Sequence, residues 1–159
     1  MMLTVVADTG AVISLALSGL FGICHKHFKI IIGEKITEEL KEISSTDDDL
    51  GKAAEEVLGV IEIKSAGKNF ITGEDEALEL LKMTEADLLI SDDIRFVKKH
   101  RENEKISFSV VLFGILLKRN IITKKDFLNA VDAMFMKRGW EENLIYLVAK
   151  NMLEEDLLC

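Results

Sequence analysis

Short apolar runs that each end at a glycine or an acidic residue alternate with helix-like segments through the first two thirds of this chain. Such runs, rich in Val, Ile and Leu and followed by helical periodicity, are typical of buried strands in βαβ units. Parallel strands need a crossover connection, and a helix usually supplies it. We therefore expect strands at residues 4–7, 29–32, 61–63 and 88–91, joined by helices at 10–20, 38–43, 50–58 and 74–83.

The last third of the chain shows helical patterns alone, which we expect at residues 94–100, 107–118, 124–137 and 141–153. Hydrophobic residues make up 48% and charged residues 30% of the sequence, a mixture that suits a folded domain. We therefore expect one α/β domain over residues 1–159, a three-layer α/β/α sandwich around a central parallel sheet. An α/β core would cover residues 1–103, and a helical C-terminal part would cover 104–159.

The cysteines and the apolar segments bear on the compartment. Cys24 and Cys159 lie far apart, without the spacing of a disulfide framework. Asp8 interrupts the apolar start of the chain, and the apolar run at 108–117 is shorter than the roughly 20 residues that span a bilayer. We expect a cytoplasmic protein without a membrane span, whose 108–117 helix is core or, alternatively, a dimer seam.

Two acidic residues directly follow expected strands. Asp8 ends the first strand and Asp92 ends the fourth. Ligands of open parallel sheets bind outside the carboxyl ends of the strands, so both carboxylates are candidate site residues. Each is equally compatible with an N-cap, because Asp often accepts hydrogen bonds at a helix start.

Two further acids border the apolar stripes of expected helices. Glu39 stands three residues after Ile36, and Glu76 stands four residues before Leu80. A carboxylate at the edge of a core is costly unless it is paired or binds a cation. The alternative for Glu39 is a salt-bridged or snorkelling side chain. Glu74 competes with Glu76, although first-turn acids often serve only the helix dipole.

Asp8, Glu39, Glu76 and Asp92 form the candidate catalytic set. Oxygen-only ligands of this kind suit Mg²⁺ or Mn²⁺. A divalent cation also resolves an electrostatic conflict, because the net charge of −8 would repel a phosphodiester. The set thus indicates metal-assisted phosphodiester cleavage.

Four short motifs resemble those of PIN domains over residues 3–101: Val5-Val6-Ala7-Asp8-Thr9, Ile36-Thr37-Glu38-Glu39-Leu40, Gly73-Glu74-Asp75-Glu76-Ala77-Leu78 and Leu88-Leu89-Ile90-Ser91-Asp92-Asp93. The resemblance implies a Mg²⁺- or Mn²⁺-dependent ribonuclease that cleaves single-stranded RNA. It implies metal ligation by the four acids above, with Asp93 and Glu74 as further members. The later segments resemble the subgroup related to VapC toxins, which implies a homodimer and a small antitoxin partner. PIN relatives often have Asp as the third acid, which leaves the choice between Glu74 and Glu76 open.

Other signals are weaker. Lys98, Lys99 and Arg101 surround His100 in the strongest basic run and are candidate RNA contacts, or simply a solvated helix face. Trp140, next to Gly139, is expected to pack the last two helices together. Two other function classes remain open: a PIN-like binding module without catalysis, and phosphoryl transfer through a nucleophilic Asp8, which the Gly at position 10 disfavours.

Overall fold

A five-stranded parallel sheet forms the centre of the computed structural model, which describes residues 2–158 and side chains through residue 155. The strands are β1 (Leu3–Ala7), β2 (Phe28–Ile32), β3 (Glu62–Ile63), β4 (Leu88–Ile90) and β5 (Ile106–Ser107), in the order β3-β2-β1-β4-β5. All pairings are parallel, and the central strand β1 aligns Val5 with Ile30 and Leu88. The expected α/β class with a central parallel sheet is confirmed.

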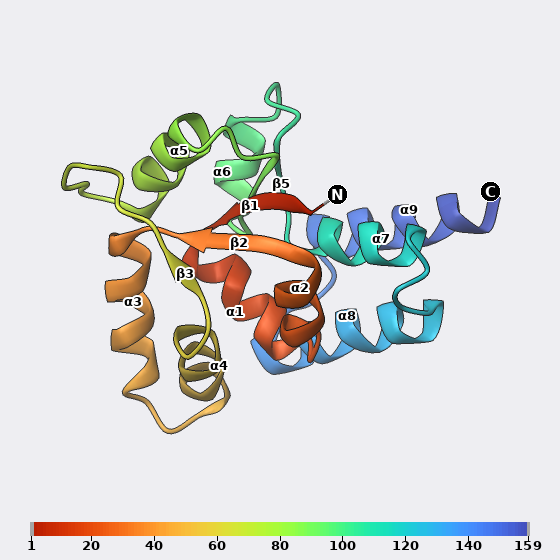
Figure 1. The fold of residues 1–159 in the computed structure, drawn as a ribbon. Helices are drawn as coiled ribbons and strands as arrows, with labels where there is room; N and C mark the ends of the chain where they lie inside the picture. Colours follow the sequence, from red (N-terminus) through yellow and green to blue (C-terminus); the bar gives the residue numbers. More distant parts are fainter. Residues whose placement is uncertain (1, 159) are drawn as a thin grey trace.

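Helices cover both faces of this sheet (Figure 1). One face carries α1 (Thr9–Leu17), α2 (Phe21–His27), α3 (Glu34–Ser44) and α4 (Asp49–Leu58), and the other carries α5 (Gly73–Met83) and α6 (Ile94–Lys99). Side chains alternate along the strands, so Val5 and Ala7 enter the larger core while Val6 enters the smaller core under α5. Both faces are buried, as a parallel sheet requires.

Three C-terminal helices extend the larger core: α7 (Val110–Lys118), α8 (Lys124–Arg138) and α9 (Leu144–Leu158). Phe113 of α7 and Phe127 of α8 are both fully buried, with ring centroids 6.3 Å apart. The apolar helix α7 is therefore a core helix, which is the first of the two expectations for it. The sheet itself continues past residue 103, because β5 pairs with β4.

Local boundaries differ from expectation where a cap or a glycine decides them. The expected helix over residues 10–20 stops at Leu17, because Gly19 adopts a left-handed φ of 82°, and α2 follows as a separate helix. Thr37 does not cap its helix as expected. The helix begins at Glu34, and the Thr37 hydroxyl instead donates to the Gly33 carbonyl at 2.9 Å.

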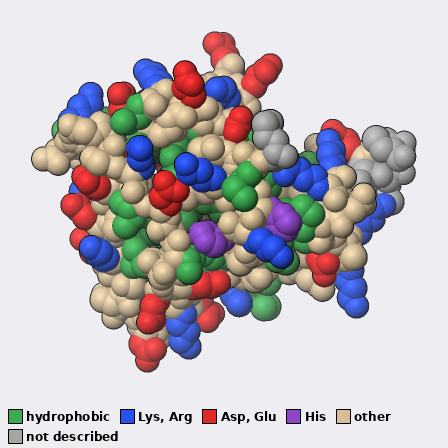
Figure 2. All heavy atoms as spheres, in the orientation of Figure 1, with side chains coloured by type: hydrophobic (Ala, Val, Ile, Leu, Met, Phe, Trp, Pro, Cys, Tyr) green, Lys and Arg blue, Asp and Glu red, His purple; other side chains and the backbone are tan. Residues whose placement is uncertain are grey.

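Several expectations concern the surface and the ends of the chain. Within residues 2–158, no single helix is long and apolar enough to cross a membrane. Acidic and basic side chains are interspersed over the face of the molecule seen in Figure 2. Cys24 is buried, and Cys159 lies outside the described residues.

Candidate active site

One pocket of about 530 Å³ opens at the carboxyl edge of the sheet. Strands β1 and β4 are neighbours with Ala7 aligned to Ile90, so Asp8 and Asp92 leave the sheet at the same edge. The acidic pocket, as we call it, is lined by Asp8, Thr9, Gly10, Ile36, Glu39, Ile71, Thr72, Gly73, Glu74, Asp92, Asp93 and Arg138. Five carboxylates from separate parts of the chain thus meet around one cavity.

Asp8 is the most buried of these acids, with 9% of its surface exposed. Its Oδ1 accepts from the Ala11 amide at 2.9 Å, which makes it the N-cap of α1, and its other oxygen accepts a short hydrogen bond from the Ser91 hydroxyl. Burial raises the pKa of Asp8 to about 7, although both hydrogen bonds oppose the increase. The capping alternative and the pocket are therefore compatible, because one oxygen caps the helix while the carboxyl group lines the cavity.

Asp92 is held by the start of α7. The Ser109 amide and hydroxyl donate to its two oxygens at 2.9 Å and 2.7 Å. Burial raises the pKa of Asp92, while hydrogen bonds from Ser14 and Ser109 and the charge of Arg138 oppose that increase. Three chain segments therefore fix the position of this carboxylate.

Glu39 enters the pocket from the inward edge of α3, as its spacing from Ile36 predicted. It is half-buried and accepts a short hydrogen bond from the Thr9 hydroxyl, whereas Glu38 and Glu42 are exposed. The start of α5 comes close because its first residue is Gly73. A β-carbon built at Gly73 would lie 2.4 Å from Ile36 Cδ1 and 3.4 Å from Glu39 Oε1.

Glu74 lines the same pocket from the first turn of α5. Partial burial of its carboxyl group raises its pKa, and so do the hydrogen bond and the charge of Asp93. Asp93 is itself the N-cap of α6, and its Oδ1 accepts from the Arg95 and Phe96 amides at 2.9 Å and 3.2 Å. These two acids complete the wall of the cavity opposite α1.

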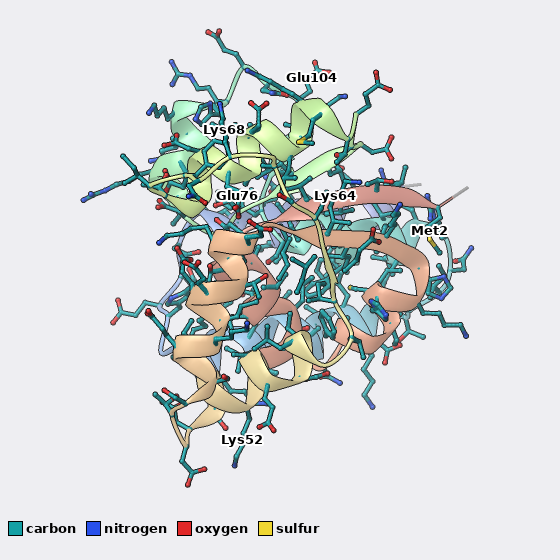
Figure 3. All side chains as sticks on the ribbon, turned by 60° about the vertical axis from the view of Figure 1, so that its left-hand side comes forward. Met2, Lys52, Lys64, Lys68, Glu76 and Glu104 are labelled. Carbon is teal, nitrogen blue, oxygen red and sulfur yellow. The ribbon has the colours of Figure 1, made fainter. Side chains whose placement is uncertain are left out.

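The structure places Glu76 outside the acidic pocket. Its carboxylate accepts from the Lys35 amide with both oxygens at 3.0 Å and from the Ile36 amide at 3.4 Å, and its side chain is 3% exposed. A β-carbon at Gly33 would fall 1.8 Å from Glu76 Oε1, so the carboxylate occupies the space that this glycine leaves. Figure 3 shows Glu76 between the first turn of α3 and α5.

Glu76 therefore caps α3 in place of the missing side chain at Gly33, which has no capping hydrogen bond of its own. We correct the expected role of Glu76 accordingly. Its backbone partners account for the burial that marked it as a candidate ligand. Of the two competing acids on α5, Glu74 is the one at the pocket.

Sequence reasoning missed Arg138, the last residue of α8, which lines the pocket beside the acids. Its Nη2 donates to the Gly10 carbonyl in a short hydrogen bond and to Ser14 Oγ at 3.1 Å. Trp140, expected to pack the last helices together, contacts Phe135 and Tyr146 neighbours of that region through Phe135 at 5.3 Å, and Arg138 lies 4.8 Å from its ring. The helix-ending Gly139, with φ 65°, was the nearest sequence signal.

The basic run lies near the pocket rather than in it. Lys98, Lys99 and Arg101 are exposed at and beyond the end of α6, and none of them lines the cavity. Lys99 is the nearest, because its positive charge lowers the pKa of Glu74. Their contact with RNA stays a prediction.

The donors of the acidic pocket suit a hard divalent cation. Asp8, Glu39, Glu74, Asp92 and Asp93 offer carboxylate oxygens, the ligands that Mg²⁺ and Mn²⁺ prefer. Within residues 2–158, however, no three His, Cys, Asp or Glu side chains are grouped closely enough to hold an ion as they stand. Hydroxyls of Thr9, Ser91 and Ser109 occupy carboxylate oxygens instead. Binding a cation would require some of these hydrogen bonds to be exchanged.

Comparison with known families gives one clear result. A family model described as a PIN domain matches residues 4–155, which includes every element from β1 into α9. Comparison with curated proteins gives no significant match.

Proposed function

Because the chain belongs to the PIN-domain family, a family of nuclease fold, we propose that it is a metal-dependent endoribonuclease acting on single-stranded RNA. The observation that carries the proposal is the convergence of five carboxylates on one pocket at the carboxyl edge of the sheet. The proposed metal ligands are Asp8, Glu39, Glu74, Asp92 and Asp93, with Mg²⁺ or Mn²⁺ as the ion.

The polar side chains around these acids would orient them. Ser91, Ser109 and Thr9 each donate a hydroxyl to a different carboxylate and so limit its rotation. Asp8 would lose its proton when a cation binds, because a raised pKa means that the metal-free carboxyl holds its proton near neutrality. When bound, a divalent cation supplies positive charge for the phosphodiester and activates water.

A cleavage assay with matched variants tests this function. A random-sequence oligoribonucleotide pool is incubated with the protein in Mg²⁺, Mn²⁺ or EDTA. We expect cleavage in either metal and none in EDTA, with a loss of about 100-fold or more in Asp8→Asn and Glu74→Gln. The control is Asp75→Asn, which removes an exposed acid beside Glu74 and should cleave like the wild type.

Other outcomes identify the competing functions. Cation binding without turnover would indicate a catalytically silent binding module, and phosphate trapped covalently on Asp8 would indicate phosphoryl transfer. Cleavage that persists in EDTA would contradict the proposal outright.

The biological role as a toxin with a small antitoxin partner, and the homodimer, stay predictions from the family resemblance. The apolar face of α7, one candidate seam, packs against α8 and α9 within the chain. A dimer would therefore have to use another surface, and light scattering of the purified protein measures whether it forms.

A further inference from the structure

A single cation lines the acidic pocket among the described residues: the guanidinium of Arg138. Its place is closely defined, because α8 ends at Gly139 and Arg138 Nη2 reaches across to the Gly10 carbonyl and Ser14 Oγ of α1. Gly10 allows this approach, since a β-carbon there would already lie 4.0 Å from Nη2. The guanidinium also lies 4.8 Å from the ring of Trp140. It is therefore fixed on two sides before any ligand arrives.

The hydrogen bonds of Arg138 are incomplete. An arginine has five N–H donors, and the structure gives protein partners to Nη2 alone. The Nε atom is buried without any hydrogen-bond partner, the only such side-chain atom among the described residues. Unpaired buried donors are uncommon in native proteins and often occur where a ligand is bound.

A purely structural role explains only part of this arrangement. Joining α8 to α1 accounts for the Nη2 contacts, but it does not require a charged group beside Asp8 and Asp92. Burial lowers the pKa of Arg138, whereas the charges of those two acids raise it. Its hydrogen bonds go to Gly10 and Ser14 rather than to a carboxylate, so neither acid is consumed by an ion pair.

We propose that Arg138 is a phosphate-binding residue of this pocket, contacting a non-bridging oxygen of the phosphodiester while the carboxylates hold the cation. This rests on the proposed function. The planar guanidinium suits phosphate oxygens, and hydrogen bonds between charged groups are stronger than neutral ones. Ser14 links the two parts of the site, because it accepts from Arg138 and hydrogen-bonds to Asp92.

The proposal predicts opposite effects on metal and on substrate. In Arg138→Met, a positive charge disappears beside the acids, so Mn²⁺ affinity by calorimetry should rise a few-fold. The kcat/KM for the oligoribonucleotide pool should fall by about 10- to 100-fold, the value of a charged hydrogen bond. Arg138→Lys should keep the wild-type Mn²⁺ affinity but recover only part of the cleavage, because an ammonium group lacks the guanidinium fork. Lys137→Met, which removes an exposed cation one residue earlier, is the control and should behave as wild type.

A second measurement does not depend on cleavage. Inorganic phosphate is titrated by calorimetry in the presence of Mg²⁺, and the fluorescence of Trp140, the only tryptophan in the sequence, reports binding beside Arg138. We expect binding to weaken at least about tenfold in Arg138→Met. Equal phosphate affinity in wild type and Arg138→Met would overturn the proposal even if the protein cleaves no RNA. A joint loss of thermal stability, Mn²⁺ affinity and cleavage would show a structural role instead.

Discussion

Replacing Asp8 by Asn should stabilise the metal-free protein while removing its proposed activity. The pKa of Asp8 is raised from 3.8 to about 7, chiefly by burial, so the folded protein holds this proton more tightly than the unfolded chain does. The resulting stabilisation is fully present below the unfolded pKa near 3.8 and is lost as pH rises through about 7. At alkaline pH the buried charge therefore destabilises the fold, and Asn never acquires that charge.

The magnitude follows from the two pKa values. Their difference, about 7 minus 3.8, is about 3 pH units, which corresponds to about 4 kcal/mol at 1.36 kcal/mol per unit. Asn keeps one carbonyl acceptor for the Ala11 amide and the Ser91 hydroxyl, which costs back about 1 kcal/mol. The net gain of roughly 3 kcal/mol would raise the melting temperature by about 6–12 °C in a domain of this size.

Thermal unfolding in EDTA at about pH 5 and about pH 8.5, followed by circular dichroism, measures the effect. We expect Asp8→Asn to melt well above wild type at the higher pH and to lose most of this advantage at the lower one. Adding Mn²⁺ should stabilise wild type more than the variant. Asp47→Asn, at an exposed acid, is the control. An Asp8→Asn protein that melts below wild type at about pH 8.5 would refute the reasoning.

Three further substitutions test the arrangement around the site. Glu76→Gln should lower the free energy of unfolding in urea by about 1–2 kcal/mol, because a charged cap of α3 is lost, and calorimetry should find Mn²⁺ affinity unchanged; a lost affinity would restore Glu76 as a ligand. Gly33→Ala places a β-carbon 1.8 Å from Glu76 Oε1 and should cost about 1–3 kcal/mol in the same assay, whereas a neutral result would show that the side chain moves freely. Thr123→Ala breaks the capping box of α8 and should cost about 1 kcal/mol, with wild-type stability arguing against that cap.

Most of the sheet was predictable from the sequence because each strand carries its own local signal. The β-branched runs before Asp8 and after Phe28 are buried on both faces, as their composition indicated. The strand β5 was not predicted, because its two residues, Ile106 and Ser107, are too few to show a pattern and depend on pairing with β4.

The acidic pocket was predictable in part. Strand ends identified Asp8 and Asp92, and helical spacing identified Glu39. The same spacing correctly gave Glu76 as a buried acid, but periodicity cannot say which group compensates a buried charge. Here the backbone amides at the start of α3 do so. Gly33, directly after a strand and without a capping side chain, was the overlooked signal.

The chain supplies its pocket from both ends of its length, with Asp8 on one wall and Arg138 on another. Synthesis on the ribosome proceeds from the N-terminus at roughly 5–20 residues per second, so the carboxylates emerge several seconds before the guanidinium does. A nascent or prematurely terminated polypeptide lacking α8 would have the acids without the cation beside them. For an enzyme proposed to cut RNA, completion of the site would thus coincide with near-completion of the protein, away from the message that encodes it.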